Sequence, residues 1–157
     1  MHLVCISASN IRHARDRSTS LKVCHLIQQI IAEKQTGSAT VDIIALVDYE
    51  LKPCIGCGAC FARGDCTADL VFNELYARLI RGDGVFIVSA HYAPIPAKLC
   101  MLLEKIEQLA FLPRFHDETR RSPLYQRPVG IIGHGGGTEN LIEWYKGPVL
   151  DTIANAL

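Results

Sequence analysis

Four of the seven cysteines lie close together in the chain, with the spacing C-x2-C-x2-C-x5-C: Cys54, Cys57, Cys60 and Cys66. Short spacings of this kind let one loop wrap a corner of a cuboidal iron–sulfur cluster and present thiolate ligands to it. The glycines between the cysteines can adopt the positive φ angles that such a tight loop needs. Zinc fits less well, because zinc sites usually pair two C-x2-C units that lie well apart. The spacing therefore predicts a [4Fe–4S] site, and a tight loop with free thiols or a disulfide is the alternative.

A second set of residues lies at the end of the first apolar run and after it, and has the chemistry to bind a phosphate group: Ser7, Ser9, Arg12, Ser18, Thr19 and Ser20. Three of the hydroxyls stand where a helix is predicted to begin, and hydroxyl and backbone N–H groups at a helix N-terminus favour an anion. Arg12, together with His13, Arg15 and Arg17, would neutralise its charge. The segment contains neither G-x-x-x-x-G-K-[ST] nor G-x-G-x-x-G, which excludes a nucleoside-triphosphate loop and a dinucleotide fingerprint. A solvated basic loop with a serine cap is the alternative.

Four apolar runs are typical of the buried strands of a parallel sheet: Leu3–Ala8, Thr40–Val47, Gly84–Ala90 and Val129–Ile132. Helical patterns alternate with them over residues 18–31, 70–80, 97–110 and 139–157, and residues 111–127 are predicted to be a loop. Strands that alternate with helices predict βαβ units with helices on both faces of the sheet. Ligands of such sheets bind beyond the carboxyl ends of the strands. Residues 7–20, 91–96 and 133–137 are expected to meet there.

Length and composition narrow the class of protein. The chain of 157 residues is predicted to form a single domain over residues 1–157. Its 16 basic and 16 acidic side chains give no net charge, which speaks against nucleic acid or an acidic membrane as the main partner. The N-terminus lacks the features of a secretion signal, and no apolar stretch reaches membrane-spanning length. Cys5, Cys24 and Cys100 stand singly in apolar patterns and are predicted to be core residues. We therefore expect a cytoplasmic protein in a reducing compartment.

From Leu3 to about Glu139 the sequence resembles the flavodoxin-like NAD(P)H-dependent FMN reductases and, within them, the iron–sulfur flavoproteins. The segment from Pro53 to Cys60, with Cys66 and Asp69, is similar to the cysteine segment of that family. The stretch after the third strand is similar to the one that lines the flavin isoalloxazine, which implies cofactor-binding roles for five residues: His91, Tyr92, Ala93, Pro94 and Ile95. The first loop is similar to the phosphate loop of the family, and the third flavin loop corresponds to three glycines: Gly135, Gly136 and Gly137.

The sequence also departs from the pattern of this family. Asn10 stands where an arginine is common, so the resemblance does not say which arginine meets the phosphate. Ala90 stands where a proline usually precedes the flavin loop. The resemblance implies a three-layer α/β/α sandwich with a doubly wound parallel sheet, but the pattern of a fifth strand is absent. The fourth strand is therefore expected to be an exposed edge, which proteins normally cover.

The resemblance implies an FMN-dependent oxidoreductase or electron-transfer flavoprotein that passes electrons between the flavin and a [4Fe–4S] cluster. NAD(P)H is the expected electron donor, and a redox protein or a small molecule is the expected acceptor. One alternative is an NAD(P)H-dependent FMN or quinone reductase without a cluster, and another is a non-catalytic redox-sensing protein. We also expect a homo-oligomer, a dimer or a tetramer, because a neighbouring copy would cover the open edge. In the family that the sequence resembles, moreover, the cluster and the flavin of adjacent subunits lie close together.

Overall fold

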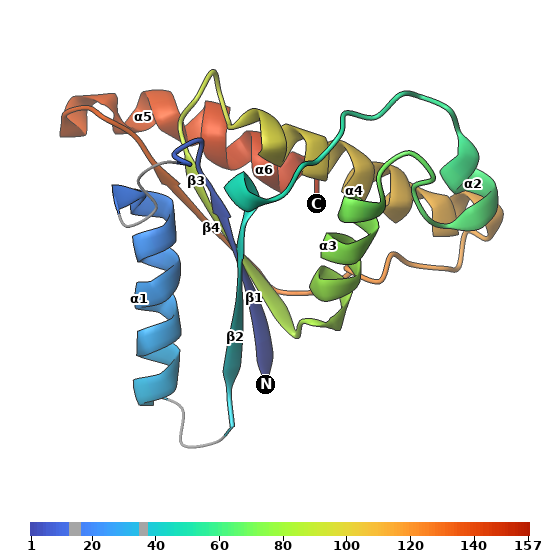
Figure 1. The fold of residues 1–157 in the computed structure, drawn as a ribbon, viewed down its shortest axis with the longest axis horizontal. Helices are drawn as coiled ribbons and strands as arrows, with labels where there is room; N and C mark the ends of the chain where they lie inside the picture. The colour runs from blue at the N-terminus through green and yellow to red at the C-terminus, as the bar shows by residue number, and fades with distance from the viewer. Residues whose placement is uncertain (13–16, 35–37) are drawn as a thin grey trace.

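The centre of the protein is a parallel sheet of four strands in the order β2-β1-β3-β4, seen in a computed structural model that describes residues 1–12, 17–34 and 38–157 (Figure 1). The strands are β1 His2–Ala8, β2 Thr40–Ala45, β3 Gly84–Ala90 and β4 Val129–His134. β1 pairs with β2 and β3, and β4 pairs with β3, all in parallel register. The four predicted strands and the flavodoxin-like fold class are thereby confirmed, except that the second strand ends at Ala45 instead of Val47.

Six α-helices are present in the described part of the chain: α1 Thr19–Lys34, α2 Ala59–Arg63, α3 Leu70–Arg81, α4 Ala97–His116, α5 Ile142–Tyr145 and α6 Thr152–Asn155. Short helical turns accompany them: η2 Leu46–Asp48, η3 Glu139–Leu141 and the π-helical η4 Lys146–Asp151. No helix among residues 1–12, 17–34 and 38–157 is long and apolar enough to cross a lipid bilayer.

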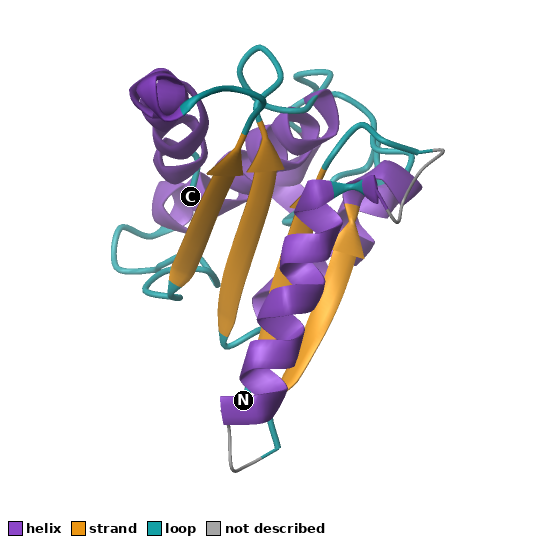
Figure 2. Ribbon diagram, turned by 90° about the vertical axis from the view of Figure 1, so that its left-hand side faces the viewer, coloured by secondary structure: helices purple, strands orange, loops and turns teal. Residues whose placement is uncertain are grey.

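The helices form layers on the two faces of the sheet. α1 lies on one face, where Cys24 packs against Cys5 and Val88 in a small buried cluster. α3, α4 and α6 lie on the other face, and Phe72, Leu99 and Ile153 from these three helices belong to the main core. Figure 2 shows α1 in front of one half of the sheet, while the other half of this face is left open.

Three sequence predictions about the helices need correction. Residues 111–116 continue α4 instead of forming a loop, because Leu109 and Leu112 extend its buried stripe by one more turn. Cys100 is exposed, since it lies off that stripe, whereas Cys5 and Cys24 are buried as predicted. The cysteine segment was expected to be a loop, but it contains the short helix α2. The residues that cap this helix at its two ends, Gly58 and Gly64, have φ angles of 67° and 76°.

The last strand, β4, is an edge of the sheet, as predicted. Within the described residues it pairs only with β3. Val149 and Ile153 are buried in the main core, and Val149 and Leu150 approach Gly133. The C-terminal segment therefore covers the α4 side of β4, whereas the face on the α1 side and the backbone edge remain open (Figure 2). Val129, at the start of this strand, is 40% exposed.

Candidate functional site

The first predicted phosphate-binding segment lies at the carboxyl end of β1 and the N-terminus of α1. The Ser18 hydroxyl accepts a hydrogen bond from the Leu21 N–H at 3.3 Å and so caps the helix. The Ser9 hydroxyl accepts one from the Ile11 N–H at 3.2 Å. Ser7 is buried on β1, whereas Thr19 is exposed in the first turn of α1. The predicted basic residues His13 and Arg15 lie outside the described residues.

Ser20 connects this segment to the end of β4. Its side chain is fully buried, and its hydroxyl donates to the carbonyl oxygen of Ala8 at 3.2 Å. The same oxygen lies 2.7 Å from Nε2 of His134. Because the hydroxyl gives its one proton to Ala8, the N–H of the imidazole is the donor in the second bond. Burial lowers the pKa of His134, which favours the neutral ring.

The loop after β3 meets the loop after β4 through the backbone and two aromatic rings. The His91 N–H donates to the carbonyl oxygen of His134 at 2.8 Å. The His91 ring lies edge-on to Tyr145 with ring centroids 4.7 Å apart, and the Tyr145 hydroxyl donates to Gly136 at 3.0 Å. Tyr92 is exposed and Ile95 is buried at the start of α4.

The remaining predicted flavin-binding residues lie at the same rim of the sheet. Ala93 is exposed and Pro94 half-buried in the loop after β3, and three exposed glycines follow β4: Gly135, Gly136 and Gly137. The structure therefore brings the three predicted flavin segments together at the carboxyl ends of β1, β3 and β4. Their roles in cofactor binding stay predictions.

A cavity of about 370 Å³ lies beside the glycine segment, lined by Gly135, Gly137, Thr138, Glu139, Tyr145 and Lys146 among others. Its walls combine the backbone of the glycines, the hydroxyl of Thr138, the aromatic ring of Tyr145 and the opposite charges of Glu139 and Lys146. Such a mixture suits a ligand that is partly flat and partly polar.

Arg12, the arginine predicted to meet the phosphate, forms an ion pair with Glu50 at 2.9 Å, and both side chains are largely exposed. Lys98 at the start of α4 lies 3.7 Å from the same carboxylate and donates to the carbonyl oxygens of Val47 and Tyr49. These residues link the loops after β1 and β2 to α4. An exposed pair of this kind contributes little stability, so Arg12 can exchange Glu50 for an anion at low cost.

The four cysteines of the cysteine loop, residues 52–69, line one pocket together with residues of α3 and α4. Phe72, Gln108 and Leu109 form part of its wall. All seven cysteines are free thiols, so the disulfide alternative is not realised in this structure. Burial raises the pKa of the Cys60 thiol, and the charges of the other three cysteines of the loop raise it further. The other three sulfurs are thus close enough to Cys60 for their charge to act on its thiol.

The described residues contain no set of three or more His, Cys, Asp or Glu side chains that could hold a metal ion as they stand. The pocket therefore brings the predicted ligands to one place without the close convergence that a single metal ion requires. The [4Fe–4S] prediction is not confirmed by this geometry.

Both ends of the cysteine loop are fixed by hydrogen bonds. The N–H of Cys54 donates to Glu104 at 2.5 Å. Cys66 exchanges two bonds with the Asn73 side chain, at 2.9 Å from its N–H and at 2.8 Å to its carbonyl oxygen. Asp69 accepts from the N–H of Lys52 at 2.9 Å. The loop is therefore held against α3 and α4 on either side of its cysteines.

Asp69 and Lys105 form a buried ion pair at 2.8 Å beside this loop. Burial by itself would raise the pKa of Asp69, but hydrogen bonds from Lys105 and from the N–H groups of Lys52 and Phe72 outweigh it and hold the pKa below its ordinary value. Neither the role of Lys105 nor the Ser20–His134 contact was predicted from the sequence. The available signal for Lys105 was its position among Leu102, Ile106 and Leu109 on the apolar face of its helix.

Comparison with known proteins gives one family match and two distant relatives. The NADPH-dependent FMN reductase family matches residues 1–144. An iron–sulfur flavoprotein of Methanocaldococcus jannaschii is 32% identical over 69 residues, which are 43% of this chain and 36% of that protein. An iron–sulfur flavoprotein of Methanosarcina thermophila is 27% identical over 108 residues, which are 68% of this chain and 51% of that protein. The chain thus matches between about a third and a half of the length of these relatives.

Solved structures agree with the fold. The apo form of an NADH:FMN oxidoreductase has a TM-score of 0.58 at 19% identity, with 97% of this chain and 68% of that chain covered. A flavone reductase has a TM-score of 0.53 at 14% identity, with 87% and 44% covered. At these identities the likeness concerns the arrangement of strands and helices.

Proposed function

Because this chain belongs to the NADPH-dependent FMN reductase family, we propose that it is an FMN-dependent oxidoreductase whose cysteine loop carries a [4Fe–4S] cluster. The proposal rests mainly on one observation: four free thiols line a single pocket in a domain of this family. The names of the two relatives, iron–sulfur flavoproteins, support the same reading. NAD(P)H is the proposed electron donor, and a redox protein or a small molecule is the proposed acceptor.

FMN would lie at the carboxyl ends of β1, β3 and β4. Thr19 and the N–H groups at the start of α1 are suited to its phosphate, and Arg12 and Arg17 are the described arginines of that loop. The loop with Tyr92 and the glycine segment would flank the ring system. Hydrogen bonds of Ser20 and His134 hold the two sides of this site together. Bound flavin would supply chemistry in steps of one or two electrons.

The cysteine loop has the donor set for a cluster: Cys54, Cys57, Cys60 and Cys66. Thiolates are the ligands of [4Fe–4S] clusters, and each bonds a different iron, so the four sulfurs need not converge as they do on a single ion. Cys54 and Cys57 are exposed and Cys60 and Cys66 are half-buried, so the solvent side of the loop is free to adjust. The positive charge of the irons would offset the mutual repulsion of the thiolates.

The decisive experiment is purification without oxygen, followed by analysis of iron and acid-labile sulfide and an ultraviolet–visible spectrum. We expect flavin bands, a broad brown shoulder and about four irons per chain, the number that a cuboidal cluster holds. Cys60→Ser should remove most of the iron and leave the flavin bands. Cys100→Ser is the matched control, because Cys100 is an exposed thiol on α4 outside the cysteine pocket. Wild-type protein without iron and sulfide would refute the cluster.

A reductase without a cluster is the second candidate. The lack of a metal-ligating group among residues 1–12, 17–34 and 38–157 is the observation that favours it. Flavin bands without the brown shoulder, with NAD(P)H oxidation unchanged in Cys60→Ser, would select this candidate. A colourless protein that does not take up added FMN would contradict both.

Free thiols persist in reducing compartments, and for this reason we propose a cytoplasmic location.

A further inference from the structure

The Asp69–Lys105 ion pair is almost completely buried. The side chain of Lys105 is 4% exposed and that of Asp69 is 1% exposed. Removing two charges from water is costly, and well-packed apolar residues would often serve stability equally well. α3 and α4 already share an apolar core through Leu75, Leu79 and Leu102. A buried pair at this place therefore calls for an explanation other than the joining of two helices.

The ion pair holds the two ends of the cysteine loop, Lys52 and Asp69, together. The ammonium of Lys105 donates to Asp69 at 2.8 Å, to the carbonyl oxygen of Met101 at 3.0 Å and to that of Lys52. Asp69 accepts from the N–H of Lys52 at 2.9 Å and from that of Phe72 at 3.1 Å. Both backbone groups of Lys52 are thus bound by the pair, just before the first cysteine, and Asp69 itself stands just after the last one. The loop begins and ends on one buried contact.

The two charges are placed unequally with respect to the cysteines. Lys105 lines the cysteine pocket, together with the ring of Phe72, whereas Asp69 is not among its lining residues. The ammonium also lies 5.2 Å from the centre of the Phe72 ring. A charge in a buried, poorly solvated position acts more strongly on its neighbours than one at the surface. The ammonium therefore borders the pocket that the thiols line, whereas the carboxylate does not.

We infer that the Asp69–Lys105 pair positions the cysteine loop and that its ammonium raises the reduction potential of the cluster held there. This inference rests on the proposed function. One-electron reduction adds one negative charge to the cluster and its thiolates, forms and breaks no bond, and takes the electron from an external reductant. A cation beside the site favours the more negative state, and net charge is one of the properties that set cluster potentials.

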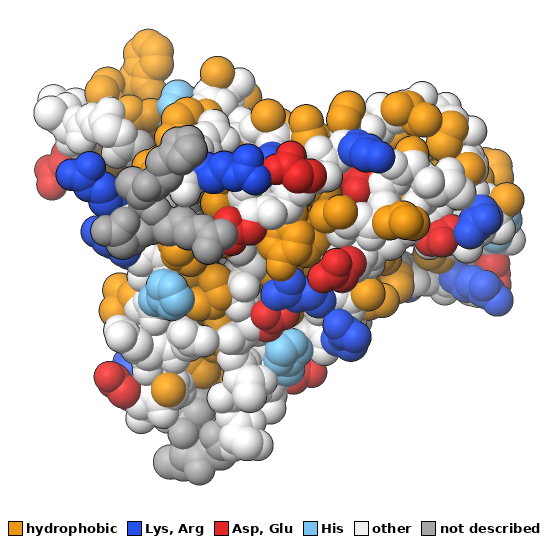
Figure 3. Space-filling view, viewed as in Figure 1, with side chains coloured by type: hydrophobic (Ala, Val, Ile, Leu, Met, Phe, Trp, Pro, Cys, Tyr) orange, Lys and Arg blue, Asp and Glu red, His pale blue; other side chains and the backbone are white. Residues whose placement is uncertain are grey.

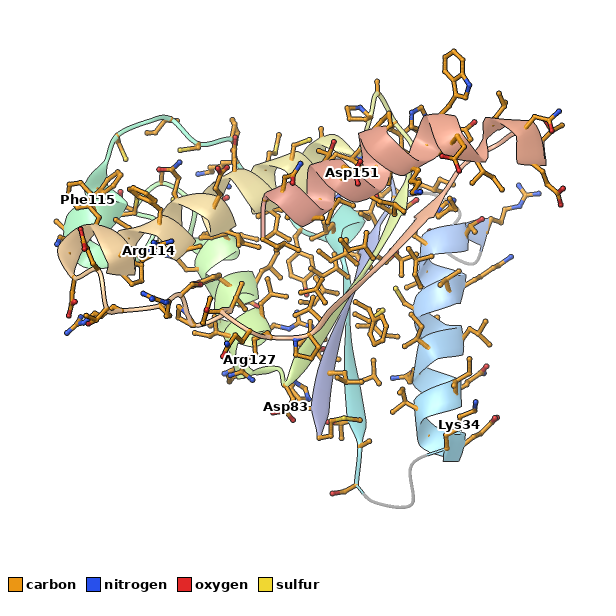
Figure 4. The ribbon with its side chains drawn as sticks, turned by 180° about the vertical axis from the view of Figure 1, so that it is seen from behind. Lys34, Asp83, Arg114, Phe115, Arg127 and Asp151 are labelled. Atoms are coloured by element: carbon orange, nitrogen blue, oxygen red, sulfur yellow. The ribbon has the colours of Figure 1, made fainter. Side chains whose placement is uncertain are left out.

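The test is the midpoint potential of the cluster, measured by spectroelectrochemistry in two variants that remove opposite charges. Lys105→Met should shift the potential to more negative values, and Asp69→Asn should shift it to more positive values. We expect each shift to change the ratio of reduced to oxidised cluster at a fixed potential by about tenfold. Lys34→Met is the control, because Lys34 is an exposed lysine at the far end of α1 (Figure 4). Its potential should equal that of the wild type.

A purely structural role predicts a different result: both variants would lose cluster and neither would shift the potential, or both would shift it in one direction. Either outcome would overturn the inference and leave the proposed function intact. If a single variant does not fold, Asp69→Asn/Lys105→Met removes both charges together and is expected to fold. Because the ammonium borders the cysteine pocket and the carboxylate does not, its potential should lie below that of the wild type, and an equal or higher value would contradict the charge argument.

The positioning role has a readout that needs no cluster. In protein stripped of iron by a chelator, hydrogen exchange of residues 52–69 should be faster in Lys105→Met than in the wild type, and unchanged in Lys34→Met. Unchanged exchange in Lys105→Met would refute the positioning role. Absence of iron and sulfide from wild-type protein is a separate result, since it would overturn the proposed function and the effect on potential, while the exchange experiment still decides whether the pair holds the loop.

Discussion

His134 is a titratable residue that joins two of the predicted flavin segments. Its ring donates to Ser20 at the start of α1, its carbonyl oxygen accepts from His91, and burial lowers its pKa. The ring is therefore neutral in the folded protein at pH values at which an exposed histidine is partly charged. Both histidines lie at the rim where FMN is proposed to bind. A proton taken up at this place would act on the stability of the protein and on the shape of the site together.

The sign of the pH dependence follows from the lowered pKa. The unfolded chain takes up the proton at about 6.5, the ordinary value for histidine, before the folded protein does. Stability is fully present above this pH and falls as the pH decreases from about 6.5 toward the lowered pKa of the folded state. His134→Gln keeps a donor for Ser20 and cannot be protonated, so its urea midpoint should vary less over this interval.

His25→Gln is the control for this measurement, because His25 is exposed on α1. It should follow the wild-type curve. A His134→Gln protein whose midpoint changes with pH as steeply as that of the wild type would show that His134 is not the group responsible.

α1 is the helix at which the phosphate of FMN is proposed to bind. Its first turn carries no acidic residue, and Thr19 is exposed there. The first turn itself therefore offers no negative side chain to the positive end of the helix dipole. A negative side chain at this place should stabilise the helix by about 0.3–1 kcal/mol, because it interacts favourably with the N–H groups of this turn. The same side chain would repel a phosphate.

Thr19→Glu therefore has two opposite expected effects. The free protein should become more stable to urea, whereas the affinity for FMN should fall by more than the affinity for riboflavin, which lacks the phosphate. Gln29→Glu, which adds the same charge at an exposed position in the middle of α1, should change neither the affinities nor their ratio. Calorimetric titration with both flavins measures the effect. Equal losses for the two flavins would place the phosphate elsewhere.

The elements with strong sequence patterns were predictable, and those that depend on contacts distant in the chain were not. The strands and the rim at which residues 7–20, 91–96 and 133–137 meet follow from apolar runs and from the geometry of parallel sheets. The extension of α4 to His116 was missed because polar residues and Pro113 obscure the stripe that Leu109 and Leu112 continue. α2 was missed because its five residues are too few to show a period.

The contacts that support the two candidate sites join residues far apart in the sequence. Ser20 and His134 are 114 positions apart, and Asp69 and Lys105 are 36 apart. Each residue alone has an ordinary explanation: a helix cap, a loop histidine, a cap of the next helix or a surface lysine. Only the fold shows that they are buried partners. The residue types at the sites were therefore accessible from the sequence, whereas the polar contacts that hold the sites were not.

The two candidate sites lie at opposite ends of the molecule. In Figure 1 α2, with the cysteine loop, lies at one end of the long axis, and α5 lies at the other. The cysteine pocket and the cavity beside the glycine segment have no lining residue in common. Apolar side chains gather around α2 (Figure 3), among them Ile55, 69% exposed, and Phe115, 64% exposed; Figure 4 shows Phe115 at that end of α4. Contiguous exposed apolar side chains are a feature of surfaces that bind other proteins.

We therefore propose a homo-oligomer in which the α2 end of one copy meets the flavin end of another, so that electrons pass between subunits. The open edge of β4 and the uncovered half of the α1 face give a second surface for self-association, and a symmetric dimer would bury such a surface twice. Sedimentation equilibrium at micromolar concentration should show a mass of about twice 17.3 kDa or more. Phe115→Glu should weaken an assembly through the α2 end, and Val129→Lys one through the β4 edge. A single species of 17.3 kDa at every concentration would remove the oligomer and any electron path between subunits.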